Sequence, residues 1–230
     1  MEKNKEIFDI TDYVGRLRFG YKKFNQVASA SIIKSKTTLL VATAAHCTYD
    51  WERKQYYEKI LFFPYFWKNK QKYKVVAVAI PKLWVELAAV EFDTCFLIME
   101  EQFEKDCDGN LHGICPKFDL PIEQNYIIGG SRLFPFLKTP YVTTSMSFPD
   151  KYQKSSLLGI KCKRTVAMSG GPWITYHDGE YVQNSMTSLS MRHAKNVLWG
   201  PYWGSTIKKA YEAAESQQEN DEITIHYFDF

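Results

Sequence analysis

Apolar and polar residues alternate in short runs along most of the chain, in the pattern typical of β-strands. Runs rich in β-branched or aromatic residues predict strands at 27–33, 38–44, 59–63, 73–80, 95–99, 124–128, 141–144, 173–176, 181–186 and 197–198. Short strands at this spacing are typical of an all-β barrel or sandwich. Between the two runs at 173–186, the dipeptide Asp178-Gly179 tolerates positive φ and predicts a tight β-hairpin.

Near the C-terminus the pattern changes to a helical period. Apolar residues spaced by three and four positions predict a helix over about 205–216, with Ser205 as its N-cap. The residues that define this period are Ile207, Ala210, Tyr211 and Ala214. Residues 223–228 then predict a last strand. This strand either adds an edge to its own barrel or serves as a partner-docking or self-inhibiting tail.

The composition is that of an ordinary globular protein. The 230 residues are 45% hydrophobic and 24% charged, and the net charge of +3 is too small to indicate a nucleic-acid surface. We find no secretory signal and no apolar stretch long enough for a membrane span. The five cysteines form no obvious disulfide framework, so we expect a reducing, cytoplasmic location.

Three segments carry candidate chemistry. The small residues of Thr43-Ala44-Ala45 lead into His46, and two glycines follow Ser169 in Ser169-Gly170-Gly171-Pro172, where they allow a sharp turn that exposes the hydroxyl. Between them, Asp93 opens an apolar run 47 residues after the histidine. Glu91 and Glu86 are the competing acids. A serine nucleophile needs such an imidazole as its base and a carboxylate to orient that imidazole.

These segments, in the order His, Asp, Ser, resemble the motifs of the chymotrypsin/trypsin-like serine protease superfamily. The subtilisin and α/β-hydrolase orders differ. The resemblance spans roughly 19–207 and implies two six-stranded antiparallel β-barrels with a C-terminal α-helix. We expect an N-terminal barrel at 1–115 with His46 and Asp93, and a C-terminal barrel at 116–230 with Ser169, the helix and the strand-like tail. A polar stretch over 100–121 connects them.

The resemblance also implies an oxyanion hole made by the backbone N–H groups of Ala167 and Ser169. Relatives usually carry glycine where this chain has Ala167, so the hole is either distorted at rest or formed normally with a negative φ. Met168 replaces the aspartate of the digestive enzymes, and Cys47 lacks its usual partner cysteine. The chain therefore looks more like the disulfide-poor glutamyl endopeptidase branch or other bacterial-type members.

Substrate-binding residues are implied by the same resemblance. Residues 184–188 would pair with the substrate backbone beside the specificity pocket, and Lys163 and Arg164 would lie at the base of that pocket. Pointing inward, these cations would favour an acidic side chain before the cut bond; otherwise they are solvated loop charges. The candidates on the substrate strand are Ser185, Met186 and Thr187, where the glutamyl branch has a histidine.

The expected function is that of a serine endopeptidase, which hydrolyses specific protein substrates through an acyl-enzyme. The competing interpretation is a catalytically weak homologue that acts as a protein-binding module. A protein or peptide substrate is the expected partner, and a regulatory protein is an open alternative. We expect no nucleic acid or membrane partner and no cofactor. No metal is expected either, because Cys107, His112 and Cys115 lack a fourth ligand and standard spacing.

Overall fold

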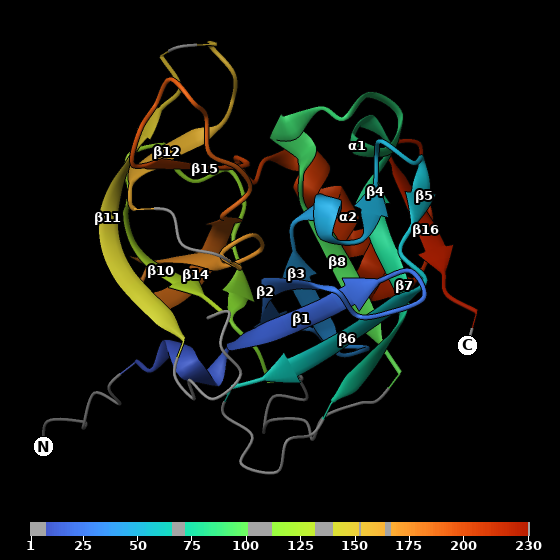
Figure 1. Ribbon diagram of the computed structural model, residues 1–230. Coiled ribbons are helices and arrows are strands. Elements are labelled where there is room, and N and C mark those ends of the chain that lie inside the picture. The colour runs from blue at the N-terminus through green and yellow to red at the C-terminus, as the bar shows by residue number, and fades with distance from the viewer. Residues whose placement is uncertain are drawn as a thin grey trace, which may run out of the picture.

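The structure is a computed structural model that describes residues 8–65, 72–100, 112–131, 140–151, 153–163 and 167–229. Two curved antiparallel sheets stand side by side, and the long C-terminal helix lies beside the first (Figure 1). The helices within these ranges are too short or too polar to cross a membrane.

The first sheet is a closed barrel. Its strands are β1 (Val14–Gly20), β2 (Gln26–Ile33), β3 (Leu40–Thr43), β6 (Lys59–Pro64), β7 (Tyr73–Pro81) and β8 (Cys95–Met99). They follow the order β7-β6-β1-β2-β3-β8, and a further pairing of β7 with β8 closes the ring. A small hairpin of β4 (Tyr49–Asp50) and β5 (Gln55–Tyr56) follows the barrel's third strand.

The second sheet is a half-barrel. Its strands are β9 (Cys115–Pro116), β10 (Asn125–Gly130), β11 (Tyr141–Pro149), β12 (Leu158–Lys161), β13 (Pro172–His177), β14 (Glu180–Met186) and β15 (Val197–Gly200). They follow the order β15-β12-β11-β10-β13-β14-β9. An isolated bridge between Leu189 and Trp199 brings the chain after β14 back to β15. The predicted double-barrel fold with a C-terminal helix is therefore confirmed.

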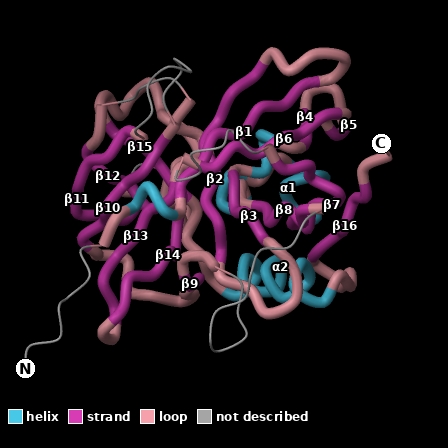
Figure 2. Tube along the Cα trace, turned by 90° about the horizontal axis from the view of Figure 1, so that it is seen from below, coloured by secondary structure: helices cyan, strands magenta, loops and turns pink. Residues whose placement is uncertain are grey.

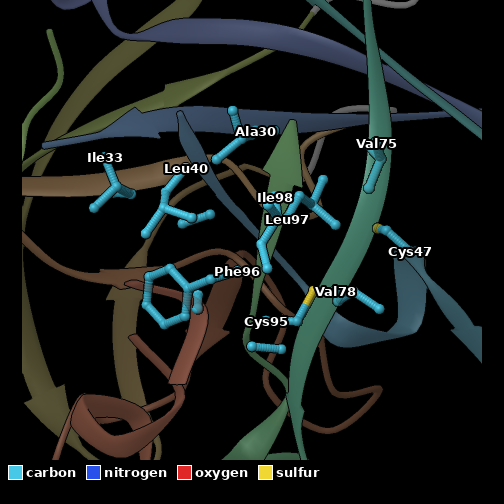
Figure 3. Close-up of a cluster of buried hydrophobic side chains, with 14 of the residues drawn as sticks. Ala30, Ile33, Leu40, Cys47, Val75, Val78, Cys95, Phe96, Leu97 and Ile98 are labelled. Atoms are coloured by element: carbon cyan, nitrogen blue, oxygen red, sulfur yellow. The ribbon is translucent and has the colours of Figure 1, made fainter. Parts of the chain in front are cut away.

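Burial explains why the first barrel holds together. β3 and β8 are buried along their whole length, because their inner faces fill the barrel and the C-terminal helix covers β8 from outside. Figure 3 shows part of this core, to which β3 contributes Leu40, β7 contributes Val75, and β8 contributes Phe96 and Ile98. Cys47 and Cys95 lie in the same core, and the four described cysteines are free thiols.

The helix α2 (Ser205–Ser216) has the predicted bounds, and its apolar period faces the core as expected. The prediction of Ser205 as its cap is wrong. Gly204 occupies the N-cap position without a side-chain cap, and a Cβ there would lie only 3.2 Å from the ring of Tyr202. The crowded approach to the helix therefore favours glycine at the position that normally carries the capping side chain.

The last strand, β16 (Ile223–Tyr227), pairs antiparallel with β7 of the first barrel. α2 also contacts β7 and β8, so the C-terminal segment returns to the first barrel (Figure 2). The division at 115/116 stays a prediction. The helix and the tail, which it grouped with the second barrel, pack on the first because Ile207 and Ile223 belong to the first barrel's core.

All ten predicted strands occur within a few residues of their expected bounds, and Asp178 and Gly179 have the expected positive φ of 49° and 93°. Several elements were not expected from the sequence. They are β1, β4, β5, β9, β12 and the helix α1 (Lys82–Leu87). β1 was overlooked, although Arg16 and Arg18 alternate with buried Leu17 and Phe19 as in a half-buried strand. Residues 101–111 of the predicted connector, Cys107 among them, lie outside the described residues.

Candidate active site

His46 lies in a short 3-10 turn, η2 (Ala45–Cys47), directly after β3. The small residues before it, Ala44 and Ala45, are fully buried and let the turn pack against the barrel. The His46 side chain, in contrast, is 35% exposed. The predicted histidine segment therefore presents an accessible imidazole on a rigid base.

Asp93 ends another 3-10 turn, η3 (Val90–Phe92), and is only 2% exposed. Its carboxylate holds His46 at two points: Nδ1 of the ring lies 2.7 Å from Oδ2, and the backbone N–H donates to Oδ1 at 2.9 Å. Two bonds fix both the tautomer and the ring orientation, with Nε2 left for a substrate or nucleophile. Among the three candidate acids, Asp93 is thus the one that the structure joins to His46.

Ser188 adds a third hydrogen bond to this carboxylate, which sequence reasoning missed. Its buried hydroxyl donates to Oδ2 of Asp93 from the segment that follows β14. The contact joins the two sheets, because Asp93 belongs to the first and Ser188 to the second. The sequence offered no signal for it, since a serine 95 residues away is an ordinary polar residue until the fold brings it there.

The electrostatics of the pair follow from burial and charge. Burial disfavours the charged imidazole, but the adjacent Asp93 carboxylate outweighs it and raises the pKa of His46 well above 6.5. Burial likewise disfavours the charged carboxylate, yet the pKa of Asp93 is lowered by His46 and by the hydroxyl of Ser188. An imidazole held this way accepts a proton readily, as a general base must.

The loop around Ser169 packs against the residues that lead to His46. The carbonyl of Ser169 accepts the backbone N–H of Ser29 at 2.7 Å. Gly170 has a φ of +77°, and a Cβ there would lie 2.2 Å from both the carbonyl oxygen of Ser29 and Oγ1 of Thr43. Only glycine fits this close approach. The half-buried Ser169 is therefore carried on a loop wedged against the end of β3, from which His46 follows.

Ala167 has a φ of +69°, in the left-handed region. Of the two expectations for this position, formation with a negative φ is not what the structure shows. The residue takes a conformation that suits glycine, at a cost of about 1 kcal/mol for an alanine. Its carbonyl accepts a 2.6 Å hydrogen bond from Oγ of Ser29, which offsets that cost.

The predicted substrate-binding residues fall into two groups. Ser185, Met186 and Thr187 are buried, and the hydroxyl of Ser185 is already bonded to the carbonyl of Pro201 at 2.8 Å. Their side chains therefore serve the core, and a role in binding substrate stays a prediction. Lys163 instead lines a pocket, and Arg164 lies outside the described residues.

This pocket has a volume of about 560 Å³. It is lined by Lys163, Ser190, Met191, Arg192, Ala194, Lys195, Asn196 and Val197. Two of these residues come immediately after Leu189, which follows the serine bound to Asp93. The pocket therefore carries three cationic side chains, Lys163, Arg192 and Lys195.

No protein-family model and no curated protein matches this sequence. Solved structures do match. Protease Anisep from Arthrobacter nicotinovorans superposes with a TM-score of 0.75 at 22% identity, over 89% of this chain and 96% of that one. The thermostable serine protease AL20 from an extremophilic microorganism gives 0.75 at 26% identity, over 90% and 99%. A Glu endopeptidase gives 0.73 at 10% identity, over 92% and 95%.

These neighbours are peptide-cleaving enzymes, AL20 among them a serine protease, and they align over nearly their whole length, which supports peptide hydrolysis as the general activity. The chain therefore has the double-barrel fold of the chymotrypsin-like serine proteases.

Proposed function

We propose that this protein is a serine endopeptidase with His46, Asp93 and Ser169 as its catalytic triad. The observation that carries the proposal is the buried Asp93 carboxylate, which fixes the accessible imidazole of His46 through the ring and the backbone. A buried carboxylate that orients a histidine beside a glycine-rich serine loop is the arrangement that activates a serine hydroxyl.

The reaction follows from these groups. Nε2 of His46 takes the proton of the Ser169 hydroxyl as its oxygen attacks the peptide carbonyl, and the backbone N–H groups of Ala167 and Ser169 receive the oxyanion. The imidazolium then protonates the leaving amine, and an acyl-enzyme forms. Water, deprotonated by the same imidazole, hydrolyses the ester and restores the Ser169 hydroxyl.

Replacing Ser169 with alanine tests the proposal. We expect turnover of casein or a peptide pool to fall by at least about 10³-fold, because the nucleophile is lost while the fold is kept. The comparison is the wild-type rate under the same conditions, with circular dichroism to check folding. Equal background rates for both proteins, together with a co-purifying partner, would instead favour the protein-binding module.

The pocket lined by Lys163, to which the chain contributes Ser190 and Met191 soon after Ser188, supports a preference for substrates with an acidic residue before the cut bond. Lys163, Arg192 and Lys195 all line it, and its described lining contains no acidic side chain. A carboxylate that enters this space gains charge-assisted contacts that an apolar or cationic side chain cannot make. We include this preference in the proposed function.

A positional-scanning peptide library measures that preference directly. We expect Lys163→Glu to lower the rate of cleavage after Glu and Asp by about tenfold, since it reverses the charge at the pocket. Lys161→Glu is the matched control, because Lys161 is an exposed lysine two residues away on β12 and does not line the pocket. Cleavage by the wild type mainly after Lys or Arg would contradict an acidic preference.

A further inference from the structure

Ser29, on β2, uses its N–H and its hydroxyl at the contact between the two sheets. It is fully buried, and its N–H donates to the carbonyl of Ser169 at 2.7 Å. Its hydroxyl donates to the carbonyl of Ala167 at 2.6 Å and accepts the N–H of Ser131 at 2.6 Å. Its own carbonyl accepts the hydroxyl of Thr43 at 2.8 Å. One residue of the first barrel therefore holds two carbonyls of the serine loop.

The two carbonyls belong to the residues whose N–H groups would form the oxyanion hole. Ala167 is held in a left-handed conformation that its Cβ disfavours. A rotation of its backbone to negative φ would relieve this strain, unless another interaction opposes that rotation. This rotation would break the hydrogen bond between the hydroxyl of Ser29 and the carbonyl of Ala167, and it would leave both buried groups without that partner. The hydroxyl of Ser29 is thus placed to oppose the collapse that an alanine at this position invites.

We propose that Ser29 is a positioning residue that keeps the oxyanion hole formed in the resting protein. The inference rests on the proposed function, because it assigns a role to Ser29 in the same site. This role explains how the chain tolerates Ala167 where a glycine would be unstrained. The hydrogen bond from the Ser29 side chain on β2 offsets the backbone strain of an alanine in the left-handed region.

The experiment compares Ser29→Ala with Ser31→Ala. Ser31 is a matched control, since it lies two residues along the same strand, is also fully buried, and bonds to Oε1 of Gln183 in the second sheet at 2.8 Å. Ser29→Ala loses two buried hydrogen bonds, to the carbonyl of Ala167 and from the N–H of Ser131, whereas Ser31→Ala loses one, and only the first variant touches the loop. The readout is the second-order rate at which a fluorophosphonate probe labels Ser169, referred to the folded fraction from circular dichroism.

We expect Ser29→Ala to label about tenfold more slowly than wild type, and Ser31→Ala to label at the wild-type rate. Adding Ala167→Gly should restore most of the loss in Ser29→Ala, because glycine reaches the left-handed region without the Cβ penalty. The pH at which labelling switches on should stay unchanged in Ser29→Ala, because the residue acts on the hole and not on His46.

Three results would overturn the proposal. One is an equal labelling rate for the two alanine variants. Another is a Ser29→Ala protein that fails to fold while Ser31→Ala folds, which would assign Ser29 to the fold alone. The third is a shifted pH dependence in Ser29→Ala. Failure of the proposed function is seen separately, as casein turnover that Ser169→Ala does not reduce; a wild-type protein that the probe does not label overturns both.

Discussion

At the scale of single residues, His46 and Asp93 form a pair whose protonation links activity to stability in opposite senses. The carboxylate raises the pKa of His46 in the folded protein, so the pair's stabilisation is fully present below the ordinary histidine pKa of about 6.5. That stabilisation is lost as the pH rises through the raised pKa. A general base, however, works only when it is neutral, so activity should grow over the same interval.

We therefore expect kcat/KM to rise with pH along a limb whose midpoint lies above 6.5. In Asp93→Asn the raising charge is gone, so the midpoint should move to lower pH and the maximal rate should fall by about 10⁴-fold. The measurement is the pH profile of peptide hydrolysis for both proteins. An unchanged midpoint in Asp93→Asn would show that the carboxylate does not govern the imidazole.

At this scale the sequence predicted the pair of His46 and Asp93, which the structure joins, and the role of Ser169 stays a prediction. The residues that surround His46 and Ser169 are small or glycine for local reasons, namely close packing after β3 and the tight approach at Gly170. Such constraints leave a readable local pattern. Ser188 and Ser29 left none, because a buried serine is recognisable as a positioning group only once its distant partner is known.

At the scale of secondary structure, the C-terminal strand β16 is a structural part of the first barrel. Ile223 is fully buried and Ile225 is 7% exposed, and the strand pairs with β7 from Ala77 to Pro81. The ring of His226 stacks on that of Tyr56 at 3.8 Å between centroids, which ties the strand to the β4–β5 hairpin. The tail thus closes a stretch of β7 that β6 leaves open.

Deleting residues 222–230 should therefore destabilise the protein. The loss of two buried isoleucines alone corresponds to about 4 kcal/mol or more, so we expect a clear drop in the thermal unfolding midpoint. The point variant Ile223→Ala should show part of the same loss, and Thr224→Ala, at a partly exposed position of the same strand, should show little. A truncated protein that unfolds at the wild-type temperature would contradict this role and reopen the docking-tail interpretation.

The elements themselves illustrate which patterns can be read from a sequence. β8 matched its prediction because a continuous apolar run of this short length is typical of a strand that is buried on both faces. β1 was overlooked although its polar and apolar residues alternate; Arg18 is exposed, whereas Arg16 reaches across to Oγ of Ser131, which follows β10 of the second sheet. A polar residue at a sheet-to-sheet contact looks the same in sequence as one that faces solvent.

At the scale of the whole molecule, a small set of buried polar contacts fixes the two sheets relative to each other. Besides the contacts of Ser29 and Ser188, Ser31 on β2 donates to Oε1 of Gln183 on β14 at 2.8 Å. Both residues are fully buried. The candidate site lies at the same junction, where Ser188 binds Asp93 and Ser29 binds the loop of Ser169.

We expect Gln183→Leu to lower the free energy of unfolding by about 1–3 kcal/mol, because it leaves the buried hydroxyl of Ser31 without its acceptor. The double variant with Ser31→Ala should recover part of this loss, since both polar groups are then removed. Chemical denaturation of the four proteins in the cycle measures this coupling. Additive losses would show that the two residues do not interact.

The sequence by itself predicted most of the strands, the hairpin at Asp178-Gly179 and the amphipathic helix, and it singled out His46, Asp93 and Ser169, of which the structure joins the first two. Each depends on periodicity or on steric limits within a few neighbouring residues, and such limits are written locally. Only the tertiary structure decided that Ser188 binds Asp93 across 95 residues, that Ser29 holds Ala167 across 138, and that the last strand returns to the first barrel. A hydroxyl or a strand edge can form hydrogen bonds with many partners. Only the folded chain decides which partner lies within reach in the buried interior, where water cannot compete.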